Sequence, residues 1–183
     1  EHMVVVVEPC VVGVYGRVLD ASGGPISHAQ LLVQGVIGTE TDTAGAFDIC
    51  VDAQGNSPDD RRLVIRATGY GTVELIAPLA GRVRHDFMLS PEATVTGRVV
   101  NSTGSPVAMA DVRLAWDEAA PRPGSEQPGI TSCVSDDNGR FECAGVAAGR
   151  LRLRAFARGA AATPATITVG PGQVKEVQVV MKQ

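Results

Sequence analysis

The chain repeats itself, and this duplication constrains its fold more than any other feature of the sequence. Three landmarks of the first half, a Gly-Arg-Val segment, a proline and an alanine, return in the second half at one constant offset. Gly16, Pro25 and Ala29 are matched by Gly97, Pro106 and Ala110. A repeat of roughly 85 residues is long enough to bury about 60% of its unfolded surface. The sequence therefore predicts two structural units built on one plan.

Each unit has the pattern of a series of short β-strands. Apolar and polar residues alternate over short runs, such as residues 63–67 in the first unit and 151–155 in the second. Turn residues interrupt these runs about every 8 to 12 residues, and no segment has a helical period. We therefore expect an all-β chain of two tandem Greek-key β-sandwich domains with about seven strands each.

The most informative segment of each unit is a tight turn. It spans residues 135–141, Ser-Asp-Asp-Asn-Gly-Arg-Phe, in the second unit and residues 41–47, Thr-Asp-Thr-Ala-Gly-Ala-Phe, in the first. Both are predicted to be β-hairpin tips, in which a three-residue loop ends on a left-handed glycine, here Gly45 and Gly139. Gly45 and Gly139 are 94 residues apart in the sequence, whereas the other matched landmarks are 81 residues apart. The second unit should thus carry about thirteen extra residues before its turn, within residues 117–129.

The register of the second hairpin predicts a disulfide bond. If the loop is residues 137–139, Cys133 lies opposite Cys143 at a non-hydrogen-bonded pair, where Cα atoms are about 4.5 Å apart. A loop one residue longer would remove this bridge. Cys10 and Cys50 either form a second bridge, which would tie the N-terminal arm to the first unit, or remain as two thiols. The four cysteines have no spacing typical of a metal site.

Composition and charge narrow the functional classes. The chain is 44% hydrophobic and 20% charged, with a net charge of −4 and scattered basic residues, so nucleic acid is not an expected partner. The alternating arginines at 150, 152 and 154 are predicted to form a solvated strand face. No apolar run approaches the roughly 20 residues of a membrane-spanning helix. Paired cysteines favour an oxidising compartment, so we expect an extracytoplasmic protein: secreted, periplasmic or on the cell surface.

A short linker, residues 90–92 with the sequence Ser-Pro-Glu, separates the two units. We expect the first domain to span residues 4–90 and the second residues 91–183, with residues 1–3 as a cloning scar. Because the linker is short, the two domains should sit close together and have little freedom to move relative to each other.

The repeated pattern resembles the carboxypeptidase regulatory-like domain, also described as transthyretin-like or prealbumin-like. It consists of G-x-V, a turn, G-x-P-[IV], an alanine, a strand, D-x-x-G-x-F and an alternating L-x-[IL]-x-A strand. The resemblance covers residues 13–89 and again residues 95–181. It implies seven-stranded Greek-key sandwiches that are usually non-catalytic accessory modules of secreted peptidases, receptors, adhesins and surface proteins.

The enzymatic and self-crosslinking relatives of this family use residues that the chain does not place correctly. Hydroxyisourate hydrolase carries a C-terminal Tyr-Arg-Gly-Ser motif, whereas this sequence has Val-Met-Lys-Gln at residues 180–183. Intradiol dioxygenases hold iron with two tyrosines and two histidines, and the spacing of these residue types here does not match. The isopeptide bond of adhesin relatives needs a lysine. Because the only lysines are Lys175 and Lys182, the first unit cannot form that bond.

Two aromatic residues are candidates for ligand binding. Trp116, the only tryptophan, ends an alternating strand and opens the loop over residues 117–129. It is either a core or rim residue or a platform for a sugar ring. Tyr70 could join it if the two units present the same side. Residues 136–138, Asp-Asp-Asn, carry oxygen ligands of the kind that Ca²⁺ uses, but turn formation explains them better.

We therefore expect a non-catalytic tandem β-sandwich module that acts in scaffolding or protein–protein interaction. Its partners would be other domains of a larger extracytoplasmic protein or a separate protein, without a cofactor, a metal or a membrane span in this segment. Two alternatives remain open. One is a carbohydrate-binding accessory module that binds polysaccharide through Trp116 and residues 117–129, and the other is an enzyme with a cryptic site between the domains.

Overall fold

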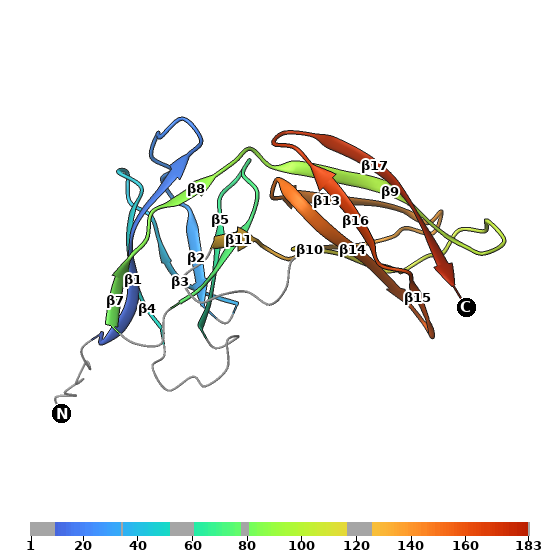
Figure 1. Ribbon diagram of the computed structural model, residues 1–183, viewed down its shortest axis with the longest axis horizontal. Coiled ribbons are helices and arrows are strands. Elements are labelled where there is room, and N and C mark those ends of the chain that lie inside the picture. The colour runs from blue at the N-terminus through green and yellow to red at the C-terminus, as the bar shows by residue number, and fades with distance from the viewer. Residues whose placement is uncertain (1–9, 34, 52–60, 78–80, 117–125, 183) are drawn as a thin grey trace, which may run out of the picture.

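The computed structural model describes residues 10–33, 35–51, 61–77, 81–116 and 126–182. Within them every regular element is a β-strand, and the strands form two lobes side by side (Figure 1). Each lobe has its own cluster of buried apolar side chains, one drawn from residues 12–89 and the other from residues 93–181. The predicted all-β, β-sandwich fold is confirmed. The cloning scar expected at residues 1–3 lies outside the described residues.

The first unit contains eight strands within the described residues, arranged in two sheets. They are β1 (Val12–Asp20), β2 (Gln30–Val33), β3 (Val36–Glu40), β4 (Ala46–Cys50), β5 (Arg62–Arg66), β6 (Val73–Ile76), β7 (Gly81–Arg84) and β8 (Phe87–Leu89). One sheet has the order β4-β1-β7, with β8 also on β1, and the other includes β6-β5-β2-β3. The late strands β7 and β8 run parallel to β1.

The second unit repeats this arrangement with its own eight strands, again among described residues. They are β9 (Ala93–Asn101), β10 (Asp111–Trp116), β12 (Thr131–Val134), β13 (Arg140–Val146), β14 (Gly149–Ala157), β15 (Ala160–Ala162), β16 (Ala165–Val169) and β17 (Val174–Lys182). β12-β10-β14-β16 correspond to β3-β2-β5-β6, and β13-β9-β17 correspond to β4-β1-β7. The last strand, β17, is again parallel to the first, β9. β15 joins the two sheets because it pairs with both β14 and β17.

Alternation along the strands separates the core from the solvent-facing surface. On β14, Leu151 and Leu153 are buried, whereas Arg150, Arg152 and Arg154 are exposed on the opposite face. This is the period of two that a strand imposes on its side chains. The arginines therefore form an outward-facing row on the β12-β10-β14-β16 sheet.

The tight turn of the second unit forms as predicted, but the strands around it do not pair. The Asp136 N–H donates to the Arg140 carbonyl at 2.8 Å and the Gly139 N–H to the Asp136 carbonyl at 2.9 Å, so the loop is residues 137–139. Beyond the turn, β12 pairs with β10, whereas β13 pairs with β9 in the facing sheet. The predicted hairpin is therefore wrong. The segment is an arch that crosses from one sheet to the other.

The turn of the first unit is an arch of the same kind. The Asp42 N–H donates to the Ala46 carbonyl at 3.0 Å, and the Gly45 N–H donates to the Asp42 carbonyl at 3.0 Å. On either side of it, β3 pairs with β2 and β4 pairs with β1. The hairpin predicted here is wrong for the same reason, because the strands before and after the turn belong to different sheets.

A buried hydroxyl group explains why the two arms of each arch separate. The Ser135 hydroxyl accepts a hydrogen bond from the Ala110 N–H at 2.9 Å and donates one to the Val107 carbonyl at 2.8 Å. Thr41 makes the same two bonds in the first unit, with Ala29 and Ile26. These bonds hold the arm before the turn against the segment that leads into β10 or β2. The arm after the turn is left to pair with the other sheet.

The turn that follows the first strand is also duplicated. The Asp20 carboxylate accepts hydrogen bonds from the N–H groups of Ser22 and Gly24 at 2.8 and 2.9 Å, and Asn101 does the same with the residues two and four positions ahead of it. The hydrogen bond from the Ser22 hydroxyl, followed by those from the Gly24 and Ser22 N–H groups, lowers the pKa of Asp20. In the second unit the same turn is made by Asn101, whose side-chain amide does not titrate.

Each unit contains one disulfide bond. Cys133 on β12 is bonded to Cys143 on β13, with Cα atoms 5.2 Å apart instead of about 4.5 Å, because the two strands lie in facing sheets and not in one hairpin. Cys10 is bonded to Cys50 at the end of β4, with Cα atoms 5.7 Å apart. The Cys133–Cys143 bond closes the edge of the second sandwich. The Cys10–Cys50 bond fastens the segment before β1 to the first sandwich.

Replacing Gly139 by alanine should destabilise the second unit much more than the same change at Gly104. Both glycines are left-handed, with φ of +73° and +84°, but a Cβ on Gly139 would overlap the Val99 carbonyl oxygen, whereas one on Gly104 meets nothing within 4 Å. We expect losses in the free energy of unfolding of about 3 kcal/mol and about 1 kcal/mol respectively. Urea denaturation measures both, and equal losses would contradict the close packing of the arch.

Peptide mapping without reduction should recover Cys133 linked to Cys143 and Cys10 linked to Cys50. Replacing both Cys133 and Cys143 by alanine should lower the free energy of unfolding by about 2–3 kcal/mol, because the bond closes a short loop. Crossed pairs, or free thiols after expression in an oxidising compartment, would contradict the arrangement.

Candidate functional site

The two units meet at the outer edge of β6, where a strand of the second unit joins the sheet of the first. This strand, β11 (Glu126–Pro128), pairs antiparallel with β6, with Glu126 opposite Leu75 and Pro128 opposite Val73 (Figure 1). It comes from the insertion predicted over residues 117–129. Residues 117–125 lie outside the described part of the chain. The remainder of the insertion supplies a fifth strand to the β6-β5-β2-β3 sheet.

Backbone hydrogen bonds extend this contact into the loop that precedes β6. The Gly129 N–H donates to the Thr72 carbonyl at 2.8 Å, and the Thr72 N–H donates to the Gly145 carbonyl at 3.1 Å. The Gly71 N–H donates to the carbonyl of Ser90, in the linker, at 3.0 Å. The loop is therefore held by the second unit and by the linker at the same time.

A buried carboxylate lies at the centre of this junction. Glu74, on β6, is only 4% exposed. One of its oxygens accepts a hydrogen bond from the Arg62 guanidinium at 2.6 Å, and the other accepts one from the Ile130 N–H at 2.9 Å. A buried charge is costly unless it is paired and hydrogen-bonded, and both oxygens of Glu74 have partners. The side chain thus connects β5 of the first unit to the segment after β11.

A second polar contact crosses the junction near β7 and β8. His85 Nε2 lies 3.4 Å from an oxygen of Glu126, and the His85 ring packs against Phe87 with ring centroids 4.6 Å apart. The pair is an ion pair only when His85 is protonated. It places the first residue of β11 against the facing sheet of the first unit.

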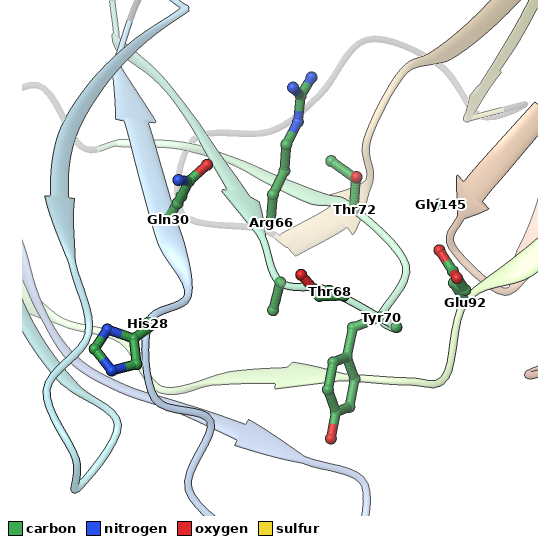
Figure 2. Close-up of a pocket in the computed structure, with 10 residues that line it drawn as sticks. His28, Gln30, Arg66, Thr68, Tyr70, Thr72, Glu92 and Gly145 are labelled. Carbon is green, nitrogen blue, oxygen red and sulfur yellow. The ribbon is translucent and has the colours of Figure 1, made fainter.

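A pocket of about 390 Å³ opens beside the junction (Figure 2). Its lining includes Arg66 and Tyr70 from the first unit and Glu92 and Gly145 from the second. Figure 2 shows the Arg66 and Tyr70 side chains pointing in opposite directions, so they do not converge on one point. The pocket can contact a ligand, but these side chains do not focus charge on a reacting atom.

Among the described residues, the histidine that lines this pocket lies beside a carboxylate. His28 lies 3.8 Å from Glu40, and the pocket's hydroxyl groups make no hydrogen bond to it. A nucleophile needs a base within hydrogen-bonding reach. Over the same described residues, no group of three or more His, Cys, Asp or Glu side chains is placed to hold a metal ion. No helix there has the length and apolar character needed to cross a membrane.

The two aromatic residues predicted to bind a ligand occupy different places. Tyr70 is half-buried, packs against the core of the first unit and lines the pocket. Trp116 is half-buried at the end of β10 and is not among the residues that line it. A Cβ built on Gly149 would lie 3.3 Å from the Trp116 ring and 3.5 Å from Pro128, so the ring lies close to β11. Ligand binding by Trp116, with or without Tyr70, remains a prediction.

The junction residues themselves were not predicted from the sequence. Glu74 is a single charged residue inside the apolar run Thr72 to Ile76. A charged residue on a strand that is otherwise buried requires a partner, because carboxylates are almost never buried alone. That signal could have identified Glu74 as a contact point, but not the strand that it contacts.

One protein-family model matches the second unit. Residues 94–182 match the family model of the carboxypeptidase regulatory-like domain. The matched range runs from β9 to the end of β17 and includes β11. No curated protein sequence matches the chain.

Several solved structures are similar to the chain at low sequence identity. The minor pilin GBS52 of Streptococcus agalactiae is 12% identical, with 94% of this chain and 96% of that one covered and a TM-score of 0.44. The Bacillus anthracis TIE protein is 9% identical over 95% of this chain and 34% of that one, with a TM-score of 0.40. The 3-chlorocatechol 1,2-dioxygenase of Rhodococcus opacus 1CP is 11% identical over 51% and 60%, with a TM-score of 0.40. The chain thus spans about a third of the TIE protein and less than two thirds of the dioxygenase.

Glu74→Gln should weaken the junction, because an uncharged amide cannot replace the carboxylate that accepts hydrogen bonds from Arg62 and Ile130. We expect the free energy of unfolding to fall by about 1.5–3 kcal/mol, the range for hydrogen bonds to charged groups. The matched control, Glu142→Gln on the exposed face of β13, should change it by less than about 0.5 kcal/mol. Urea denaturation compares the two, and equal small effects would contradict the role of Glu74.

Proposed function

Because residues 94–182 match the carboxypeptidase regulatory-like domain, we propose that the chain is a non-catalytic tandem module of a secreted or cell-surface protein. Its two domains, residues 4–90 and 91–183, act as a scaffold that holds a fixed spacing and presents surfaces to protein partners. The observation that carries this proposal is the junction. β11 pairs with β6, so the domains are joined through a sheet as well as through a linker.

The energetics of the junction support a rigid scaffold. Domains connected by a linker alone normally move relative to each other. Here such a movement must break the β11–β6 pairing, the bonds at Thr72 and the contacts of buried Glu74. Each hydrogen bond contributes about 1 kcal/mol net, and the set acts together. The relative orientation of the domains is therefore fixed in our proposal.

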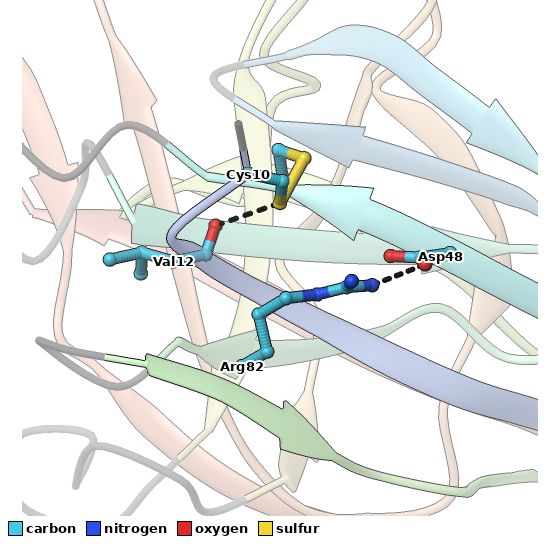
Figure 3. Close-up of a disulfide and its surroundings, with 5 residues drawn as sticks. Cys10, Val12, Asp48 and Arg82 are labelled. Atoms are coloured by element: carbon cyan, nitrogen blue, oxygen red, sulfur yellow. Dashed lines mark hydrogen bonds and ion pairs between the residues drawn. A yellow bond between two sulfur atoms is a disulfide. The ribbon is translucent and has the colours of Figure 1, made fainter. Parts of the chain in front are cut away.

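The disulfides support an extracytoplasmic location. Such bonds persist in oxidising compartments and are rare in the cytosol. Figure 3 shows the Cys10–Cys50 bond beside an ion pair between Arg82 and Asp48. The bond fastens the segment before β1 to β4, and the ion pair links β7 to β4 across β1. This end of the module is thereby cross-linked by a covalent and an ionic contact.

The pocket supports a binding role and not a catalytic one. Its side chains diverge, and the described residues that line it contain no nucleophile with a bound base. The partners in our proposal are other domains of the parent protein or a separate protein subunit. No cofactor is needed for such a role.

Spin labels placed at Ala21 and Ser102, equivalent exposed positions of the two domains, test the scaffold. Introduced as non-natural amino acids, they leave the disulfides intact. We expect double electron–electron resonance to give one narrow distance distribution, which Glu74→Gln should broaden. A broad distribution in the unmodified protein would contradict a fixed spacing. Turnover of any substrate in a panel of hydrolase and oxygenase substrates, with and without Fe and Zn, would contradict the non-catalytic role.

A further inference from the structure

A hollow of about 510 Å³ lies over β1, the central strand of the β4-β1-β7 sheet. Its lining comes from these three strands and consists of Tyr15, Gly16, Arg17, Ala46, Phe47, Asp48 and Arg84. Tyr15 and Arg17 are exposed, whereas Val14 and Val18 are buried in the core, so the hollow lies on the solvent-facing side of the sheet. β1 is paired with β4 on one side and with β7 and β8 on the other. A ligand in the hollow therefore meets side chains and not a free strand edge.

Tyr15 supplies the apolar surface of the hollow, and it is 40% exposed. The Arg82 guanidinium lies over the Tyr15 ring, 5.6 Å from its centroid. Arg82 lies beside Gly13 in the sheet, whereas the lining of the hollow extends from Tyr15 toward Arg17. One side of the ring is thus covered by Arg82, and the other side faces the hollow. An exposed aromatic ring with one open face is a surface on which the apolar face of a sugar ring stacks.

Guanidinium groups outnumber carboxylates around the hollow. Asp86 serves two arginines, because one of its oxygens accepts a hydrogen bond from the Arg17 N–H at 3.0 Å and the other accepts one from the Arg84 guanidinium at 2.9 Å. Asp48 forms an ion pair with Arg82 (Figure 3). Three guanidinium groups thus share two carboxylates, although the net charge of the whole chain is −4. Both ion pairs are exposed to solvent, where such pairs contribute little to stability, so they can rearrange around the anionic group of a ligand.

The second unit has a hollow in the same place with different chemistry. By the register of the two sheets, every residue that lines the first hollow has an equivalent that lines a hollow of about 590 Å³ over β9. The arginine of the central strand is kept, as Arg98. Thr96 stands in place of Tyr15, and Glu176 stands in place of Arg84. The second hollow therefore has no ring at the Tyr15 position and has a carboxylate where the first has a guanidinium.

We propose that the hollow over β1 binds an acidic polysaccharide, that is, a chain that contains uronic acid sugars. One sugar ring stacks on the open face of Tyr15, and its carboxylate pairs with the Arg17 guanidinium in the two-pronged geometry that this planar group favours. Asp48 accepts hydrogen bonds from the sugar hydroxyl groups. An extended protein segment suits the hollow less well, because β1 is already paired on both sides and strand addition requires a sheet edge. The inference goes beyond the proposed scaffold and does not depend on it.

Calorimetric titration of the full chain with tetramers of galacturonate, mannuronate and glucuronate tests the proposal. We expect at least one tetramer to bind, and its methyl-esterified form, which has no charge, to bind about tenfold more weakly. Tyr15→Ala and Arg17→Ala should each weaken binding about tenfold, because they remove the stacking ring and the paired guanidinium. Tyr15→Phe keeps the ring and should retain most of the affinity. Thr96→Ala and Arg98→Ala are matched controls at the equivalent positions of β9 and should leave binding unchanged.

Urea denaturation of each variant separates a loss of binding from a loss of folding. Several results would overturn the proposal. They are absence of binding to all three tetramers, equal binding of the methyl ester, equal losses in the two β9 controls, or equally tight binding of a hexaglutamate peptide, which would mean that the face attracts anions without recognising sugar. None of these results changes the distance between spin labels at Ala21 and Ser102. The proposed scaffold can therefore stand if the tetramers fail to bind, and it fails separately if that distance is broadly distributed.

Discussion

The backbone groups at an open sheet edge need hydrogen-bond partners, and the structure depends on how β6 meets this requirement. Its edge is covered by β11, a strand that belongs to the other unit. Beside this pairing, Glu74 is buried and bonded to the Ile130 N–H, and the loop before β6 is bonded to Gly145 and to the linker. The two sandwiches are thus joined by strand pairing and hydrogen bonds as well as by the three-residue linker.

Duplication and insertion together account for this arrangement. The two copies keep the same arch, with the Thr41 or Ser135 hydroxyl at its base and a left-handed glycine at its tip. They differ where the second copy gains residues before its arch, and the end of that insertion becomes β11. The first copy has a glutamate at the position that meets the insertion, and the second has Thr166. The two copies thus differ at this strand, because β6 receives β11 and carries the buried Glu74.

The sequence predicts local features well, but it predicts poorly which sheet each strand joins. We could predict the duplication, the strands, the turn residues and the position of the insertion from the sequence. Each of these depends on spacing or on the backbone conformation of a few residues. The hairpin prediction failed because a turn such as residues 136–140 does not determine which sheet its arms join. Long-range bonds of Ser135 decide that. β11 has the sequence Glu-Gln-Pro, which has no strand propensity, and it is extended only because β6 lies beside it.

The direct test is native-state hydrogen exchange at the junction amides. The N–H groups of Thr72, Gly129 and Ile130 donate to Gly145, Thr72 and Glu74, and all three bonds cross between the units. If the junction joins the sandwiches into one body, these amides should exchange as slowly as those of core strands β5 and β14, through global unfolding. If they exchange as fast as exposed loop amides while the cores stay protected, the two units are not held together by this strand.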